Sequence, residues 1–300
     1  MARRLSVLGV GEHHVAKKMI NGRPAMTTRR KMTIATWRPS RAGVIHGTMT
    51  VDATAALRYL EDLRERTGER VTVTALVGAA VGRALAAEPT LNGRIAFGRY
   101  IPFDDVVVSF LVQMDEGDDL AQVRVEDADR KSVVEVIRDL HARAAKLRTG
   151  EDEAYEKSKK TMKILPTWAL RRVLSFSGFV TSGLGKPAFG QPAFPFGAAI
   201  ITSVGMLGID EAFVPPTPFA RVPIYVAVGA IRDMVFVEEG APVVRPGITL
   251  TCTLDHRFVD GFQAGGLARE MRRSFTDPTS LGAVPEGGPI ASEVTDSPAT

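Results

Sequence analysis

The sequence predicts an α/β protein with a mixed sheet that carries helices on one side. The first observation is that apolar residues recur at helical spacing in several segments of the first half. The second is that the other half is dominated by short segments rich in valine and isoleucine, which are typical of strands. Strands and helices do not alternate strictly as βαβ units, which argues for a mixed sheet. The 300 residues allow one large domain or two small ones.

The first half predicts helices around one buried strand. Residues 52–68 place leucines on one stripe and end at a glycine, while residues 74–87 are apolar nearly all round and predict a buried helix. The valine-rich run 106–112 predicts a buried strand. Ser132 and Glu135 have the spacing of a capping box, and apolar residues recur behind them at helical intervals.

The second half predicts strands followed by one helix. Residues 198–203 and 222–231 are apolar strand segments, and 233–244 has the pattern of a hairpin that turns at Glu-Glu-Gly. Residues 248–254 alternate threonine with apolar residues, which predicts a strand buried on one face only. Residues 264–275 carry apolar residues at helical spacing and predict a final amphipathic helix.

Composition excludes several classes of protein. The chain is 45% hydrophobic and 24% charged, as in globular proteins and unlike a collagen or a coiled-coil rod. The formal net charge of +4 is too small to predict nucleic-acid binding. Because Cys252 is the single cysteine, the chain can form neither an internal disulfide nor a zinc site built from cysteines. The adjacent residues His13 and His14 cannot present both rings to one metal ion. No bound metal is therefore expected.

The boundaries of the domain follow from changes in composition. We expect an N-terminal arm over 1–44, one catalytic domain over 45–275 and a disordered, proline-rich tail over 276–300. Residues 150–197, lysine-rich at first and then apolar, stand out as a helical and loop insertion. No apolar run approaches the ~18–20 residues that span a bilayer. The N-terminus begins like a signal peptide, but glycines interrupt its apolar stretch. A cytoplasmic protein is therefore expected.

The segment from Asp255 to Gly261 carries the strongest sign of chemistry. His256 follows an alternating strand by one residue, and a histidine at such a position can act as a general base near neutral pH. Asp260 falls at the expected N-cap of the last helix and could fix the loop through an ion pair with an arginine. The same residues also make ordinary turn chemistry, so the pattern alone leaves both interpretations open.

Three segments in the same order resemble a known family. Residues 254–261 (Leu-Asp-His-Arg-Phe-Val-Asp-Gly), 200–208 and 88–92 (Glu-Pro-Thr-Leu-Asn) are similar to motifs of the catalytic domain of the dihydrolipoamide acyltransferases of 2-oxoacid dehydrogenase complexes. Residues 226–231 resemble the strand that leads toward the first motif. The likeness covers roughly residues 45–275. Chloramphenicol acetyltransferase is a more distant resemblance, and the implied fold is the two-layer sandwich of these coenzyme A-dependent acyltransferases.

The resemblance implies roles for particular residues. His256 would deprotonate a thiol of coenzyme A or dihydrolipoamide, and the Thr202 hydroxyl would donate to the oxyanion of the attacked thioester. Ser203 is the adjacent candidate, but neighbouring side chains on a strand point to opposite faces, so only one of the two hydroxyls can serve. Arg257 and Asp260 would fix the loop. The sequence carries basic candidates for a salt bridge to the signature aspartate in the N-terminal region, Arg29 and Arg30.

The resemblance also implies partners and an assembly. The substrates would be acyl-coenzyme A and an acyl acceptor, without a lipoyl group on the chain itself, and the active sites would lie between the subunits of a homotrimer. Three functions stay open: transfer to a thiol of the dihydrolipoamide type, transfer to a hydroxyl or amine of a small molecule, and a catalytically silent scaffold.

The chain also departs from the family pattern. We expect no lipoyl domain and no peripheral-subunit-binding domain before the matched region. The insertion 150–197 is longer and more apolar than the usual connection. It could line an acyl pocket, cover the site, rest on a membrane surface, or form an extra helix packed on the core or on a neighbouring subunit.

Overall fold

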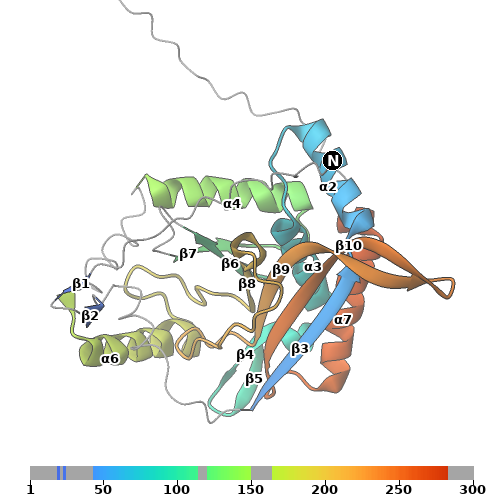
Figure 1. Ribbon diagram of the computed structural model, residues 1–300. Coiled ribbons are helices and arrows are strands. Elements are labelled where there is room, and N and C mark those ends of the chain that lie inside the picture. Colours follow the sequence, from blue (N-terminus) through green and yellow to red (C-terminus); the bar gives the residue numbers. More distant parts are fainter. Residues whose placement is uncertain (1–18, 21–22, 25–42, 114–119, 150–163, 283–300) are drawn as a thin grey trace, which may run out of the picture.

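A six-stranded mixed sheet organises the protein, in a computed structural model that describes residues 19–20, 23–24, 43–113, 120–149 and 164–282 (Figure 1). Its strands are β3 (Val44–Asp52), β6 (Val108–Gln113), β7 (Leu120–Val125), β8 (Ala199–Ser203), β9 (Ile224–Glu238) and β10 (Ala241–Asp255). The order is β3-β10-β9-β8-β6-β7. The pairs β6–β8 and β8–β9 are parallel and the others antiparallel, which confirms the mixed sheet.

Two smaller pairs of strands lie outside this sheet. One is the short pair β1 (Met19–Ile20) and β2 (Arg23–Pro24), and the other is the hairpin of β4 (Gly93–Ala96) and β5 (Arg99–Pro102). The β4–β5 hairpin follows the short turn η1 (Pro89–Leu91) and contacts the His256 loop, where the rings of Tyr100 and Phe258 meet edge to face at 6.2 Å.

Four helices cover one face of the sheet, as the sequence predicts. They are α2 (Thr54–Thr67), α3 (Val73–Ala87), α4 (Val133–Arg148) and α7 (Gly261–Thr276). Their apolar residues and those of the sheet form one continuous core. The central helix α3 is buried on nearly all sides, which explains why its sequence is apolar all round. The capping box of Ser132 and Glu135 is present at the start of α4.

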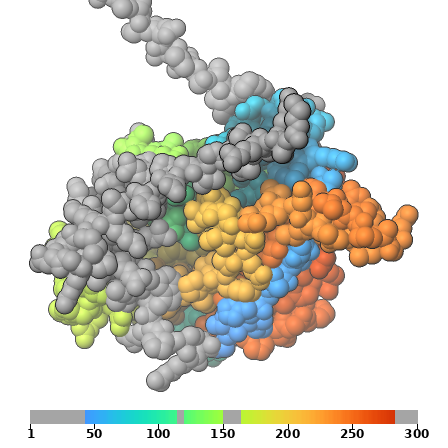
Figure 2. All heavy atoms as spheres, in the orientation of Figure 1, coloured from blue at the N-terminus to red at the C-terminus, as the bar shows by residue number. Residues whose placement is uncertain are grey.

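The opposite face of the sheet is covered by the chain segment 204–222 and, over β6 and β7, by residues 195–196 of the insertion. Figure 2 views this side, with the gold atoms of that segment beside the blue atoms of β3. A small second core joins Ile200 and Tyr225 of the sheet to Ala220 and Val222. Thr251 of β10 is 2% exposed and its hydroxyl donates to the carbonyl of Ala212. The expected one-sided burial of 248–254 is therefore wrong, because both faces of β10 are covered.

Strands β9 and β10 form one long hairpin that extends beyond the sheet (orange in Figure 1). The sequence suggested separate strands over 222–231 and 233–244, but 15 residues run unbroken in each strand. The turn at Glu239 and Gly240 falls where Glu-Glu-Gly predicted it. Apolar side chains stay exposed on this arm, among them Val235 and Val244, which pair across the two strands and are each 69% exposed.

The folded part of the chain extends beyond the expected boundary at residue 275. After α7 ends at Thr276, the short turn η5 (Pro278–Leu281) packs back onto the core, and Leu281 is fully buried. The tail expected over 276–300 is therefore wrong for its first residues, and 283–300 lie outside the described residues. No helix in the described ranges combines the length and apolarity needed to cross a bilayer.

The insertion contains a helix, α6 (Thr167–Gly178), followed by the π-helical turn η3 (Phe179–Gly183). Only Leu170 and Gly178 are buried in α6, whereas Trp168 and Phe176 are exposed. Gly178 lies so close to segment 204–222 that a Cβ there would stand 2.3 Å from the carbonyl oxygen of Phe219. The C-terminal end of the helix therefore packs directly against segment 204–222.

Candidate active site

His256 stands just beyond the end of β10, in an exposed loop between that strand and α7. Its Nδ1 lies 2.8 Å from the carbonyl oxygen of Val259. Because a carbonyl oxygen can only accept, Nδ1 carries the hydrogen and donates it. The Nε2 lone pair is therefore the one available to take a proton, which is the tautomer that a general base requires.

Asp255 and Arg257 hold the loop together. The Asp255 carboxylate accepts hydrogen bonds from the Arg257 backbone at 3.0 Å and from its guanidinium Nε at 2.9 Å. These bonds to Asp255 raise the pKa of Arg257. The backbone of Asp255 is fixed in turn, since its N–H donates to the carbonyl of Pro223 at 2.9 Å. The ion pair of this loop thus joins Arg257 to the residue two positions before it.

Asp260 is the N-cap of α7, as expected from its position. Its carboxylate accepts from the N–H groups of Phe262 at 2.8 Å and Gln263 at 3.4 Å. The Gln263 side chain accepts from the Asp260 N–H in return, which completes a capping box. Asp260 and Arg257 both fix the loop, but through separate partners. The candidate arginine partners Arg29 and Arg30 lie outside the described residues.

Thr202 and Ser203 end β8 on opposite faces of the sheet. Ile201 belongs to the helix-side core and Ile200 to the second core, so the alternation of a strand places Thr202 on the face of segment 204–222 and Ser203 on the helix side. Both side chains are half-buried. As the sequence predicts, the two hydroxyls cannot serve one site.

The chain does not bring His256 and Thr202 together. Thr202 pairs with Ala227 of β9, which pairs with Thr251 of β10, so His256 lies five residues farther along the strand direction. At ~3.3 Å per residue this offset is ~17 Å, before the separation across the strands is added. His256 and Thr202 therefore stand near opposite ends of the sheet within one chain.

The lone cysteine is not available as a nucleophile. Cys252 packs against the helix-side core, and burial raises the pKa of its thiol to about 12. At neutral pH the group is therefore a thiol and not the reactive thiolate. Within the described ranges, no three histidine, cysteine or acidic side chains are grouped so that they could hold a metal ion.

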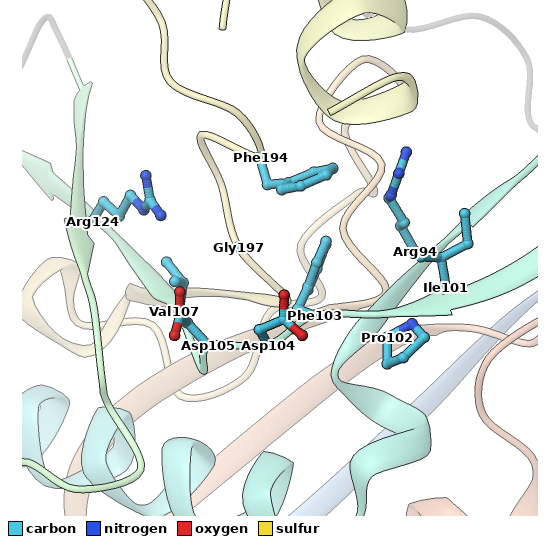
Figure 3. Close-up of a pocket in the computed structure, with 10 residues that line it drawn as sticks. All are labelled: Arg94, Ile101, Pro102, Phe103, Asp104, Asp105, Val107, Arg124, Phe194 and Gly197. Carbon is cyan, nitrogen blue, oxygen red and sulfur yellow. The ribbon is translucent and has the colours of Figure 1, made fainter. Parts of the chain in front are cut away.

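Two cavities of about 280 Å³ each adjoin the β4–β5 hairpin at the end of the sheet where His256 lies. Figure 3 shows the first, where Phe194 of the insertion lies above Asp104 and Asp105, with Arg94 and Arg124 at the sides. The second is lined by residues of the hairpin, the His256 loop and segment 204–222, namely Ile95, Pro218, Arg221, Arg257 and Phe258. Sequence reasoning named Arg257 as a site residue and included Phe258 in the motif 254–261, but it missed the other three.

Comparison with known proteins identifies the family. The family described as 2-oxoacid dehydrogenases acyltransferase (catalytic domain) matches residues 21–165 and 196–283, and leaves out 166–195 of the insertion. The chain is 26% identical to the dihydrolipoyllysine-residue acetyltransferase component of the acetoin cleaving system of Bacillus subtilis, over 85% of this chain and 56% of that protein. It is 23% identical to the lipoamide acyltransferase component of the branched-chain alpha-keto acid dehydrogenase complex of the same species, over 85% and 53%. The chain thus spans about half the length of these curated relatives.

Solved structures share the fold. A probable dihydrolipoamide acetyltransferase from Listeria monocytogenes superposes with a TM-score of 0.61 at 20% identity, covering 87% of this chain and 95% of that one. A dihydrolipoamide acetyltransferase from Azotobacter vinelandii gives a TM-score of 0.57 at 18% identity, covering 80% and 84%. Because the family match spans most of the sequence and includes the His256 loop, the chain belongs to the acyltransferase catalytic domains of the 2-oxoacid dehydrogenases.

Proposed function

We propose that the protein transfers an acyl group between a coenzyme A thioester and a thiol of the dihydrolipoyl type, with His256 as general base. The observation that carries this proposal is the hydrogen bond from His256 Nδ1 to the Val259 carbonyl, which leaves Nε2 free in an exposed loop. The family and its relatives, which are named as dihydrolipoyllysine-residue acetyltransferases and lipoamide acyltransferases, support the choice of substrates.

The reaction follows from the free Nε2 atom. It accepts the proton of the acceptor thiol, whose reference pKa is about 8.5, so the transfer to a neutral imidazole has a modest cost. The thiolate attacks the thioester carbonyl carbon and a new carbon–sulfur bond forms. The carbonyl oxygen takes the negative charge and accepts a hydrogen bond from the Thr202 hydroxyl. When the intermediate collapses, the old carbon–sulfur bond breaks and the departing thiolate recovers the proton from Nε2.

This reaction needs two copies of the chain, because His256 and Thr202 stand near opposite ends of the sheet. A homotrimer in which His256 of one subunit faces Thr202 of the next would bring them together. The mechanism of the Azotobacter vinelandii enzyme involves a serine, a histidine and an asparagine. Its asparagine follows its histidine by four positions, as Asp260 follows His256, and its serine precedes the histidine by 52 positions, against 54 for Thr202.

The β9–β10 arm supplies a surface for such an assembly. Ile231, Val235, Val237 and Val244 are between 45% and 77% exposed in the isolated chain. An apolar row of this kind on an arm that projects from the sheet is typical of a surface that is covered in the assembly.

Mixed assemblies test the proposal. Thiol release from a panel of acyl-coenzyme A esters is measured with dihydrolipoamide, and with alcohols and amines as competing acceptors. The His256→Ala variant should lose about 10²–10⁴-fold of the rate and Thr202→Ala about 10²–10³-fold. If the two variants are unfolded and reassembled together in equal amounts, one site in four should combine an intact His256 with an intact Thr202.

The mixture should therefore recover about a quarter of the parent rate, which neither variant approaches alone. A mixture that stays at the average of the two variants would show that the hydroxyl and the imidazole do not share an intersubunit site. Ser203→Ala serves as the matched control, and it should retain the parent rate because its side chain points to the other face. A parent protein with turnover only on alcohols or amines, or with none at all, would overturn the proposed thiol acceptor.

A further inference from the structure

The second cavity adjoins the His256 loop and is rich in positive charge. Of its five lining residues, two are arginines, Arg221 and Arg257, and the remaining three are Ile95, Pro218 and Phe258, which carry no charge. Arg257 is the direct neighbour of His256, and Phe258 follows it. A ligand in this cavity would therefore lie beside the loop that carries the general base.

Arg221 is held firmly at this place. Two residues after it, the carbonyl of Pro223 accepts the N–H of Asp255 at 2.9 Å, so the segment runs alongside the His256 loop. Its backbone has φ = 55°, in the left-handed region that residues other than glycine adopt rarely. Such a conformation persists only where the surroundings impose it, and it often marks a functional position.

In the described part of the chain, the charge of Arg221 is not matched by an acidic partner. None of the ion pairs formed among the described residues includes Arg221, whereas Arg257 is paired with Asp255. Desolvation, and then the nearby charge of Arg257, lower the pKa of Arg221. Among the described residues, Asp255 thus neutralises Arg257, and Arg221 keeps a positive charge that an anion could neutralise.

The insertion positions this arginine. The guanidinium carbon of Arg221 lies 5.8 Å from the ring centre of Phe179, which starts the turn η3. At the other end of η3, Gly183 is so close that a Cβ there would stand 3.2 Å from Arg221 Nη1. Both residues lie within 166–195, the part of the chain that the family match leaves out. Arg221 is therefore positioned by a part of the chain that the family match does not include.

We propose that Arg221 and Arg257 bind an anionic group of the acyl donor, and that this group is the terminal carboxylate of a short dicarboxylic acyl chain. The proposal rests on the proposed acyl transfer. A terminal carboxylate stands only a few bonds from the thioester carbonyl, which must lie near His256, whereas the phosphates of coenzyme A are separated from it by the whole pantetheine arm. The position of the cavity beside the loop that carries His256 thus favours the acyl chain as the source of the anion.

The experiment compares two donors with the same number of carbon atoms, succinyl-coenzyme A and butyryl-coenzyme A, with dihydrolipoamide as acceptor. The parent should prefer the succinyl ester. Arg221→Gln should lose about 10- to 100-fold in kcat/KM for succinyl-coenzyme A, mostly as an increase in KM, and less than about 2-fold for butyryl-coenzyme A. For succinyl-coenzyme A, the kcat/KM of Arg221→Lys should lie between those of the parent and of Arg221→Gln. Lysine keeps the positive charge but lacks the planar guanidinium group.

Arg172→Gln is the matched control. Arg172 lies on α6 with its guanidinium carbon 5.5 Å from the ring centre of Trp168, but it does not line the cavity. The Arg172→Gln variant should show the same preference between the two esters as the parent. Unfolding temperatures of all three variants are measured alongside, so that a general loss of structure is recognised.

The outcomes separate the possible sources of the anion. A loss that is equal for both esters, and that disappears with 3′-dephospho-coenzyme A esters, would assign the site to the 3′-phosphate of coenzyme A and overturn the carboxylate. Equal loss with every ester, or no loss at all in Arg221→Gln, would overturn the site for an acyl carboxylate. If the parent turns over no ester, calorimetric titration with succinyl-coenzyme A still tests the inference: weaker binding to Arg221→Gln than to the parent supports it, and equal binding overturns it.

Discussion

The imidazole of His256 is oriented by a backbone carbonyl of its own loop, three residues away. This arrangement is local, and so the sequence could reveal it: a histidine one residue past a strand, followed by a helix N-cap, defines a short loop with few conformations. Arg221 could not be found in that way. The position of Arg221 depends on Phe179, and on the hydrogen bond from Asp255 to the nearby Pro223, and both partners are distant in the sequence. In addition, no sequence motif marks an arginine with a left-handed backbone conformation.

Cys252 should be dispensable for catalysis. With a pKa of about 12, roughly one thiol in 10⁴ is ionised at pH 8, so the residue cannot carry the acyl group as a thioester. Cys252→Ala should retain kcat within about 2-fold, and a maleimide should label the parent slowly unless it is first unfolded in urea. Rapid labelling of the folded parent at pH 8, with loss of activity, would contradict this expectation.

Tyr225 should make stability depend on alkaline pH. The Thr217 N–H donates to its hydroxyl oxygen at 2.8 Å, and burial raises the pKa of Tyr225 from 10.0 to about 12. Above pH 10 the unfolded chain releases this proton more readily than the folded one, so the stabilisation present below pH 10 is lost as the pH rises toward 12. Two pKa units correspond to about 3 kcal/mol in the free energy of unfolding.

Urea unfolding of the parent between pH 9 and 12 measures this loss, with Tyr225→Phe as the comparison. The variant should be less stable at pH 8, because Thr217 loses its acceptor, but its stability should fall less steeply above pH 10. Parallel curves for the two proteins would show that Tyr225 does not titrate in this range.

Among the elements, those with local signals were predicted most closely. The capping box of α4 and the N-cap of α7 depend on residues three positions apart, and both are present. The buried helix α3 follows from its uniform apolarity. The length of β9 was not evident, since charged residues interrupt its apolar run where the strand leaves the sheet and both faces become accessible.

Docking of α6 should depend on the missing side chain of Gly178. Gly178→Ala places a Cβ against the Phe219 carbonyl, so α6 must shift away from segment 204–222 at a cost of about 1–3 kcal/mol in the free energy of unfolding. Limited proteolysis should then cut the insertion faster. Gly47→Ala is the control, because nothing lies within 4 Å of a Cβ at that position of β3. Equal proteolysis of the two variants would show that α6 docks without this close contact.

For the whole molecule, the class of fold and the helix-covered face were predictable from periodicity, and the comparisons confirm the fold. What covers the other face was not, because segment 204–222 has no regular pattern and its contacts with Thr251 and Tyr225 are set by the tertiary fold. The interpretation of 276–300 as a disordered tail was wrong for its first residues for a related reason. Pro278 and Leu281 are buried, but in the sequence they are isolated apolar residues among polar ones and form no pattern.

Assembly should depend on the exposed arm. The double variant Val235→Glu and Val244→Glu places two like charges directly opposite each other on the β9–β10 hairpin, in the surface proposed to face another subunit. Analytical ultracentrifugation should show a smaller species than in the parent, and acyl transfer should fall with it. A variant that sediments like the parent and keeps its rate would place the contact elsewhere.

The distance between His256 and Thr202 along the sheet has a consequence for kinetics. For a site completed by a neighbouring subunit, diluting the enzyme removes active sites as well as molecules. Below the dissociation constant of the proposed trimer, the rate per milligram of protein should fall with dilution, and the total rate should approach the third power of the chain concentration. The amount of chain present would then itself decide when acyl transfer begins.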